Sequence, residues 1–335
     1  MRANFPPLHY VGWSPRFRRI VAEASRMTVA QATVATDQHV FLIGRPPVGE
    51  FLGFIRALAV DGQSQNQGQL TAEWRLANDH VLQLETQEPG VADNPAIAPL
   101  PQELSGMETE LRASPYFQRA FQFVPTDIAI VELDRLIVFQ KHIDLTHVAQ
   151  IRASLPQNPN SRDLFEVCLP LNREPAPVRL MQTAQNIYTF ISPSTDFRFC
   201  EAVLLDPAQI SGYPAMGPVT ATIALVVGYG SNYLNAVHVD NRLVLSNGSH
   251  RAYALREHGV THVPCAVQRV TRRDELELIG SDELKQNPDR YLKSPRPPLL
   301  KDYFDQRLRK LVPVARKLRM VKVSFGVDTG EIPAH

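Results

Sequence analysis

The chain has 335 residues, with 44% hydrophobic residues, 21% charged residues and a formal net charge of +1. This length can bury a substantial core in one large domain or two, and the near-zero charge excludes a protein that is basic overall for nucleic-acid binding. The three cysteines, Cys168, Cys200 and Cys265, give neither a disulfide framework nor a CxxC metal pair, so we expect a cytoplasmic protein. The longest apolar run, around Ala224–Val227, is too short to cross a bilayer, so no membrane partner is expected.

Residues 1–125 contain signals for short helices and strands, but no recognisable chemistry. The expected elements are a helix at 14–26, a strand at Val40–Ile43, a helix that Thr71 caps and Pro89 ends, a linker at Val91–Pro101, and a helix that begins at Ser114. We therefore expect this region to be an accessory helix and strand region.

After Asp127 the sequence becomes richer in strand-forming residues. The expected elements are a strand over Ile128–Phe139, a helix between Asp144 and Pro156, and strands at Phe165–Leu169, Ile187–Ile191 and Val219–Val227. The last of these is aliphatic and β-branched throughout, which predicts a buried central strand.

The segment 237–268 has the clearest local pattern. A strand ends at Leu245, Asn247 and Gly248 allow a sharp turn, and a helix begins at Ser249 or His250. Gly259 ends this helix, and a second strand containing Cys265 follows, where we expect that cysteine in the core. Before the first strand, Asp240 and Asn241 predict a hairpin turn.

The turn before this helix has the features of an anion site. Unpaired amides and the positive end of the helix dipole converge there, which favours a negatively charged ligand. Ser249 adds a hydroxyl, His250 a ring donor, and Arg251 a guanidinium suited to phosphate or carboxylate. The alternative is an ordinary strand-to-helix turn in which Ser249 only caps the helix and Arg251 pairs with a nearby carboxylate.

The C-terminal segment 273–335 begins with short helices, which Ser281 and the Asn287-Pro288 pair initiate, and ends on a strand with alternating apolar residues from Val321. Residues 307–322 carry seven Lys and Arg residues and no acidic residue, so they form a possible contact for nucleic acid.

Two motifs resemble the ParB/sulfiredoxin superfamily. The string SNGSHRAYALREHGVTHVPCAV, from Ser246, is similar to the family pattern of a strand, Gly-x-x-Arg, a helix and a second strand. The segment 130–141, followed by the helix at 146–155, looks like the family's first motif, which has a strand, a glutamine with a basic neighbour, and a helix. Together the motifs match about fifty residues and are separated by about 85 residues, a longer insertion than compact members carry.

The resemblance implies a nucleotide-binding site. By position, Asn247, Gly248, Ser249, His250 and Arg251 would hold phosphates, and Gln140 and Lys141 would line the facing wall. The family includes ATP-dependent sulfinic acid reductases, CTP-binding chromosome-partition proteins, nucleases and a free-serine kinase.

Departures from the family pattern narrow these activities. Ser249 stands where the reductases place a catalytic cysteine, which argues against that chemistry because a hydroxyl cannot replace a thiolate at neutral pH. Residues 273–290 show no DNA-reading helix of the kind that follows the module in partition proteins. The kinase branch needs a carboxylate near the first motif, for which Glu132, Asp134 and Asp144 are the substitutes.

We therefore expect a mixed α/β or α+β fold, with a ParB/sulfiredoxin-like module at 126–272, an insertion at 157–236, and flanking regions 1–125 and 273–335. The first functional hypothesis is a nucleotide-dependent enzyme that uses ATP or another nucleotide in phosphoryl transfer or hydrolysis. Its expected catalytic residues are Asp134, Glu132 and His250, with Asp134 or Asp240 holding Mg²⁺. The alternatives are a nucleic-acid-associated ParB-like protein or nuclease that uses 307–322, and a non-catalytic ligand-sensing or assembly module.

Overall fold

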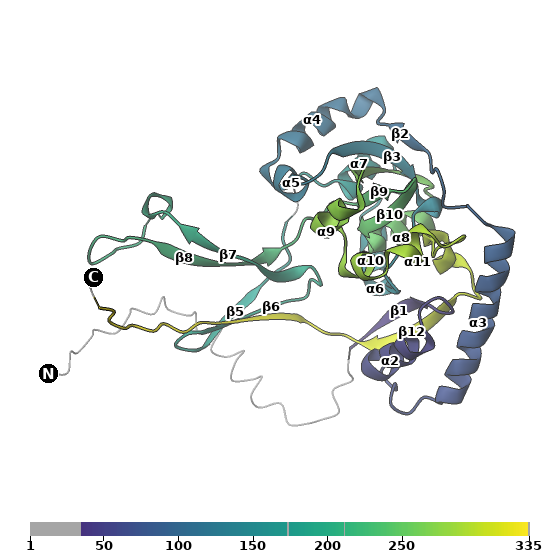
Figure 1. The fold of residues 1–335 in the computed structure, drawn as a ribbon, viewed down its shortest axis with the longest axis horizontal. Coiled ribbons are helices and arrows are strands. Elements are labelled where there is room, and N and C mark those ends of the chain that lie inside the picture. Colours follow the sequence, from purple (N-terminus) through teal and green to yellow (C-terminus); the bar gives the residue numbers. More distant parts are fainter. Residues whose placement is uncertain (1–34, 173, 211, 334–335) are drawn as a thin grey trace. The chain divides into compact units, whose positions relative to one another are not determined.

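The computed structural model describes residues 35–172, 174–210 and 212–333, and the helix expected at 14–26 lies outside these ranges. Thr36–His335 forms one compact unit. Its fold is mixed α+β, as the sequence predicted, with small sheets and helices that alternate along the chain (Figure 1). Within the described ranges, no helix has both the length and the apolar character that crossing a bilayer requires.

The largest sheet has the strand order β10-β9-β11-β3-β2. Its strands are β2 (Ile97–Pro99), β3 (Thr126–Glu132), β9 (Asn235–Val239), β10 (Arg242–Asn247) and β11 (His262–Arg269). β9 and β10 form an antiparallel hairpin, and Asp240 and Asn241 at its tip both have positive φ, which confirms the predicted turn. β11 lies parallel to β9 and antiparallel to β3.

Helices cover both faces of this sheet, because side chains that alternate along a strand point to opposite faces. Leu243 and Leu245 pack with one group of helices: α4 (Ser105–Ala113), α5 (Pro115–Ala120), α6 (Leu145–Ala153), α7 (Ser161–Cys168) and α8 (Ser249–Glu257). Val237 and Val244 pack with a second group: α9 (Leu276–Ile279), α10 (Asp282–Gln286) and α11 (Pro288–Leu292). Cys265 is fully buried in the first core, as expected.

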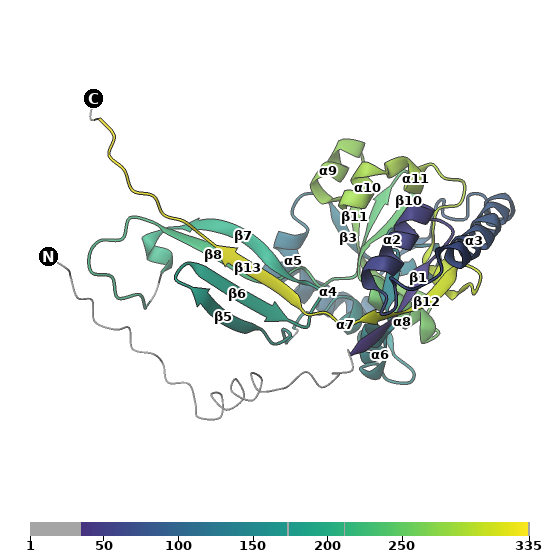
Figure 2. The same cartoon turned by 90° about the horizontal axis from the view of Figure 1, so that it is seen from below.

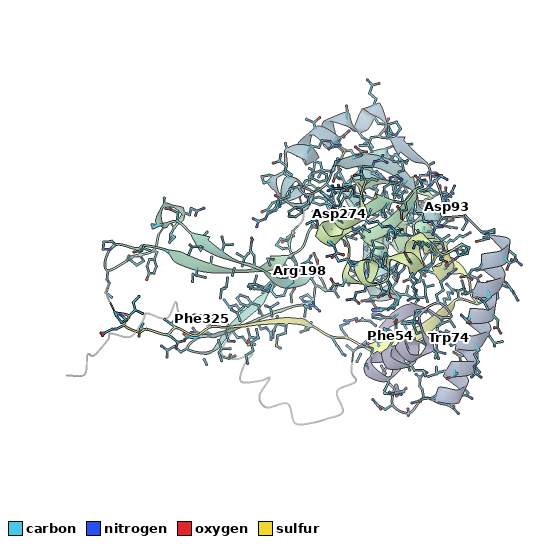
Figure 3. The ribbon with its side chains drawn as sticks, viewed as in Figure 1. Phe54, Trp74, Asp93, Arg198, Asp274 and Phe325 are labelled. Carbon is cyan, nitrogen blue, oxygen red and sulfur yellow. The ribbon has the colours of Figure 1, made fainter. Side chains whose placement is uncertain are left out.

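A second sheet joins distant parts of the sequence, with the order β12-β1-β4. Its strands are β1 (Thr36–Leu42), β4 (His142–Asp144) and β12 (Arg309–Ala315). The helices α2 (Val48–Leu58) and α3 (Gln67–Gln87) pack on it through Phe51, Ile55, Ala77 and Val81 (Figure 1). Figure 3 shows Phe54 and Trp74 on these two helices.

The segment between α7 and β9 forms two further sheets (Figure 2). β6 (Ile187–Ser192) pairs with β5 (Arg179–Ala184) on one side and with the C-terminal strand β13 (Arg319–Ser324) on the other, and β7 (Phe197–Leu205) pairs with β8 (Thr222–Tyr229). Short 3-10 helices complete the fold: η1 (Gln102–Leu104), η2 (Leu133–Arg135), η3 (Pro207–Gln209), η4 (Arg273–Glu275) and η5 (Leu300–Phe304).

Four expectations about local structure were wrong. The apolar run Phe165–Leu169 belongs mostly to helix α7, whose N-cap Asn160 forms a capping box with Asp163. The run Val219–Val227 contributes to β8, which is a strand of an exposed hairpin and not a buried central strand.

The third concerns α3, which begins at Gln67, one turn before the expected cap, because Asn66 accepts hydrogen bonds from the amides of Gly68 and Gln69. In addition, the expected linker Val91–Pro101 contains β2, which pairs with β3.

Candidate functional site

The predicted strand, turn, helix and strand are present as β10, Gly248, α8 and β11. Gly248 has φ +94°, a conformation that strains any residue with a Cβ. A Cβ there would also lie 3.1 Å from Leu234. The amide of Gly248 donates to the side chain of Asn247, whose own amide group donates to the carbonyl of Ser231. Glycine is therefore required by the backbone and by the close approach of the 231–234 loop.

Arg251 points into the protein, where its guanidinium is bound by main-chain carbonyls. One terminal nitrogen donates to the carbonyls of Val167 and Cys168, both at 3.1 Å, and to that of Asn232 at 2.6 Å. The other donates to the Asn232 side chain at 3.0 Å. This geometry differs from the expected outward-facing phosphate ligand, because the end of α7 and the 230–234 loop already use these donors.

His250 also has an internal partner. Its Nε2 accepts a hydrogen bond from the backbone amide of Asp144 at 3.1 Å, so the ring acts as an acceptor and not as the expected donor. Burial, with the nearby His147, His142 and His39, lowers the pKa of His250 to about 3. A neutral histidine is thus built into the contact between α8 and β4.

Ser249 is buried in the first turn of α8. It lies beside Arg251 and His250 in sequence, but both of those side chains are directed into the fold. Residues 247–251 do not line the cavities at Glu103–Arg162 or at Lys141. Phosphate binding by this turn stays a prediction, and the internal hydrogen bonds of His250 and Arg251 do not favour it.

The expected catalytic and Mg²⁺-binding carboxylates lie away from the turn. Asp134 binds Arg256 at 2.6 Å, near the opposite end of α8, roughly 10 Å along the helix from Ser249. Glu132 lies at the end of β3, opposite His262. Asp240 binds Arg273 at the hairpin tip, roughly 20 Å along β10 from Gly248. The structure therefore does not bring these three carboxylates together.

Gln140 and Lys141, by contrast, lie at the same sheet edge as the turn. Ile137 pairs in parallel with Val244, and the two segments exchange the hydrogen bonds Ile137 N to Leu243 O and Leu245 N to Ile137 O. Because neighbouring parallel strands end at the same edge, the residues after Ile137 and after Val244 emerge together. However, Gln140 and Lys141 line a separate small cavity.

This cavity measures about 20 Å³, enough for one water-sized group. Its polar residues are Arg45, Gln140, Lys141, Arg290 and Tyr291, and its apolar wall includes Leu42, Val138 and Phe139. Arg45 and Arg290 are 245 positions apart in the sequence, so only the tertiary structure brings them to the same cavity.

Arg45 is the unusual residue of this cavity. Its side chain is only 8% exposed, and its Nε and one terminal nitrogen have no hydrogen-bond partner among the described residues. The carboxylates of Asp302 and Glu85 approach it only to 3.7 and 3.8 Å. Asp302 already binds Arg296 and the amide of Leu299.

The Arg45 guanidinium stays charged in spite of its burial. Burial lowers its pKa to about 10, which remains well above neutral pH. A buried charge without hydrogen-bond partners is costly, so its two free donors favour an anionic partner.

The backbone around Arg45 is held rigidly. Asn78 of α3 donates to the carbonyl of Gly44 at 2.7 Å, and the indole of Trp74 donates to that of Pro46 at 2.9 Å. Arg290 donates to the carbonyl of Arg45 itself at 2.6 Å. Gly44 packs so tightly on α3 that a Cβ would lie 2.6 Å from the Ala77 backbone. Three hydrogen bonds to the carbonyls of Gly44, Arg45 and Pro46 therefore hold the backbone that carries the Arg45 side chain.

The other cations of the cavity have partners. Lys141 pairs with Glu50, and Glu283 lies 3.5 Å from Lys141 and 3.7 Å from Arg290. Both cationic side chains are 28% exposed, so they are accessible from solvent. The lining of the cavity thus combines two partly exposed cations, Lys141 and Arg290, with the buried guanidinium of Arg45.

Sequence reasoning identified Gln140 and Lys141 but missed Arg45 and Arg290. Arg45 follows the expected strand Val40–Ile43 and precedes two prolines, and Arg290 lies in the short helix α11. Gly44, which precedes Arg45, indicated a special backbone conformation at this point. The residues of α3 and α11 that bind the carbonyls of Gly44 and Arg45 are distant in sequence, so the sequence did not reveal them.

The basic run 307–322 is largely ion-paired or hydrogen-bonded. Lys310 binds Glu73, Arg316 binds Asp37, and Arg307 lies 3.4 Å from Asp305. Arg319 donates to the carbonyl of Phe197. Because these groups already have internal partners, the run has fewer accessible charges than its composition suggests.

Among the described residues, no group of three or more His, Cys, Asp and Glu side chains has a geometry that could hold a metal ion.

No protein-family model matches the chain, and no curated protein and no solved structure shows significant similarity to it. The resemblance to the ParB/sulfiredoxin superfamily therefore remains a prediction from the two motifs.

Proposed function

We propose that the protein binds a small anion, or the terminal phosphate or carboxylate of a larger ligand, in the cavity formed by Arg45, Gln140, Lys141 and Arg290. The observation that carries this proposal is the buried Arg45 guanidinium, two of whose nitrogens have no hydrogen-bond partner among the described residues. Carboxylate and phosphate oxygens are the acceptors that best match a guanidinium.

The size of the cavity defines what enters it. A volume of about 20 Å³ admits one oxygen atom of such a group, so the rest of the ligand would have to lie outside it, where the partly exposed Lys141 and Arg290 could contact it. A terminal phosphate is favoured over an internal one, because it has three non-bridging oxygens and a substituent on one side only, so it approaches a small cavity with less steric hindrance. The nucleotide expected from the family resemblance is one ligand of this class, and the proposal concerns its binding and not its turnover.

The larger groove near α4 and α7 is a weaker candidate. It measures about 480 Å³ but is open and lined by Glu103 and Glu110, and Asn160 on its wall already caps α7. The one cation of this groove, Arg162, pairs with Glu166, whereas the Arg45 cavity has three cationic residues in its lining, so the surroundings of Arg45 support anion binding better.

The test is a thermal-unfolding panel with phosphate, sulfate, acetate, ATP and CTP on the wild-type protein, Arg45→Met and Arg75→Met. An anion present at ten times its Kd should stabilise the wild-type fold by about 1.4 kcal/mol, a shift of roughly 2 °C or more. Arg45→Met should lose the shift, because methionine fills similar space without donors. Arg75 is exposed on α3, so Arg75→Met should keep it.

An equal shift in all three proteins would place the binding site elsewhere, and no shift with any anion would reject the proposal. Isothermal titration calorimetry with ATP and with phosphate compares the affinities of the two ligands. If the whole nucleotide contributes, ATP should bind more tightly than phosphate, and both should depend on Arg45.

A further inference from the structure

Glu283 of α10 lies beside three of the residues that line the Arg45 cavity. Its Oε2 lies 3.5 Å from Nζ of Lys141, and its Oε1 lies 3.7 Å from a terminal nitrogen of Arg290. The same Oε1 accepts a hydrogen bond from the hydroxyl of Tyr291 at 2.8 Å. Glu283 itself is not part of the lining. The protein therefore places one of its own carboxylates next to three groups of the proposed anion site.

Glu283 differs from the other carboxylates near this cavity. Among the described residues, it is the one carboxylate that forms ion pairs with two of the cations in the lining. Each of the others pairs with one of these cations: Glu50 with Lys141, and Glu85 and Asp302 with Arg45. A carboxylate that pairs with two cations has the arrangement expected of a bound anion.

Neither cation depends on Glu283 for its position. Lys141 also pairs with Glu50, and Arg290 donates to the carbonyl of Arg45 at 2.6 Å. The distances of 3.5 and 3.7 Å from Glu283 are longer than an N–H···O hydrogen bond, and the three side chains are all partly exposed. Exposed ion pairs of this kind contribute little, so another anion can replace the Glu283 carboxylate on Lys141 and Arg290.

The backbone of α10 does not have to move for this exchange. Leu284, the next residue, is 1% exposed and packs in the core that contains Val237 and Val244. At the start of α10 (Figure 1), the side chain of Ser281 accepts a hydrogen bond from the amide of Leu284. Because the helix is anchored in this way and Glu283 is partly exposed, its side chain can rotate into solvent by itself.

Tyr291 keeps an acceptor when the Glu283 carboxylate leaves. Tyr291 is 1% exposed, and burial raises the pKa of its hydroxyl well above the ordinary value, so it remains a donor at neutral pH. Because Tyr291 lines the cavity, an oxygen of the ligand can accept this hydrogen bond in place of Glu283. Phosphate and carboxylate both supply such an oxygen, so the exchange leaves no buried donor without a partner.

We propose that Glu283 competes with the ligand for Lys141 and Arg290, and that its carboxylate leaves these two cations when an anion binds. This inference rests on the proposed function, because it requires the anion site at Arg45. It makes Glu283 a residue that weakens anion binding, so that only an anion that pairs with the same cations more strongly than Glu283 does can replace it.

Isothermal titration calorimetry with inorganic phosphate on the full chain tests the competition. Glu283→Gln should lower the Kd for phosphate by roughly fivefold, because the amide still accepts from Tyr291 but no longer forms the two exposed ion pairs. Glu283→Asp keeps the charge on a shorter side chain, which reaches the cations less well, so it should also bind phosphate more tightly than the wild type. Glu277 on α9 is exposed, so Glu277→Gln is the matched control and should leave the Kd unchanged.

The outcomes separate this inference from the proposed function. No phosphate binding by the wild type or by Glu283→Gln would reject the anion site itself, whereas binding by Glu283→Gln alone would support both. A folded Glu283→Gln variant with an equal or higher Kd than a binding wild type would overturn the competition and leave the anion site in place. A lower Kd in Glu283→Gln but not in Glu283→Asp would also overturn it, since general repulsion by a nearby charge would then be sufficient. If circular dichroism shows that Glu283→Gln is unfolded, the Kd of Glu283→Asp decides.

Discussion

Arg45 and Arg251 are both buried arginines, but their surroundings give them different roles. Arg251 donates to three main-chain carbonyls and to the side chain of Asn232, so it joins α8 to the end of α7. The Nε and one terminal nitrogen of Arg45 have no such acceptors among the described residues. At the residue scale, a guanidinium is a structural group where carbonyls surround it and a binding group where its donors are unused.

Replacing Arg251 should therefore destabilise the fold and leave anion binding unchanged. Arg251→Met leaves the carbonyls of Val167, Cys168 and Asn232 without this donor, at an expected cost of about 3 kcal/mol or more in the free energy of unfolding. Urea denaturation of the variant measures this cost, with Arg75→Met as the control. A decrease in the free energy of unfolding below about 0.5 kcal/mol would show that the Arg251 hydrogen bonds are not needed for stability, since surface substitutions change stability by about that amount.

At the scale of elements, local signals predicted some structures and not others. The unit β10–α8–β11 was predictable because Gly248 and Gly259 mark its turns and its strands are short and aliphatic. The run Phe165–Leu169 was not, because a short apolar run fits a buried strand and a helix end equally well. The prediction that Val219–Val227 is buried was wrong for a related reason: the composition of a strand does not show which other strand pairs with it.

The same limit applies to the candidate site. Gln140 and Lys141 follow a recognisable strand, so they could be identified from the sequence. Arg45 could not, because its significance depends on α3 and on Arg290, and no local pattern reports that a donor lacks an acceptor.

The contact between β4 and α8 should make stability depend on pH. Burial, followed by the charge of His39, lowers the pKa of His142 to about 4, and burial lowers that of His250 to about 3. Above pH 6.5 both rings are neutral in the folded and unfolded states. Below it the unfolded chain takes up protons first, so stability should fall between about pH 6.5 and pH 4, by up to ~1.4 kcal/mol per pH unit for each histidine.

Chemical denaturation at pH 7.5, 6.5, 5.5 and 4.5 measures this slope. His250→Gln should reduce it, because glutamine can accept the amide hydrogen bond of Asp144 without titrating. His262→Gln alters an exposed histidine and should keep the wild-type slope. Equal slopes in all three proteins would assign the pH dependence to other groups.

At the scale of the whole molecule, the expected regions 1–125, 126–272 and 273–335 share their sheets and cores. β12 pairs with β1, and β1 pairs with β4, so one sheet contains a strand from each region. The core on one face of the large sheet joins Val237 and Val244 to Leu284 and Tyr291. Even the proposed anion site combines Arg45, Lys141 and Arg290, one from each region.

This interleaving predicts that residues 126–272 do not fold alone. Without the C-terminal region, the face of the large sheet that carries Val237 and Val244 loses the side chains of α9, α10 and α11, and β4 loses β1 when the N-terminal region is absent. Exposing that apolar face removes several side chains from the core, each contributing on the order of 1.5–3 kcal/mol. Losing five of them costs roughly 7.5–15 kcal/mol, which is comparable to the whole ~5–15 kcal/mol stability of a typical domain. Circular dichroism melting should show a cooperative transition for 36–335 and none for 126–272. A cooperative melt of the shorter fragment would mean that the flanking regions only cover a module that is already stable.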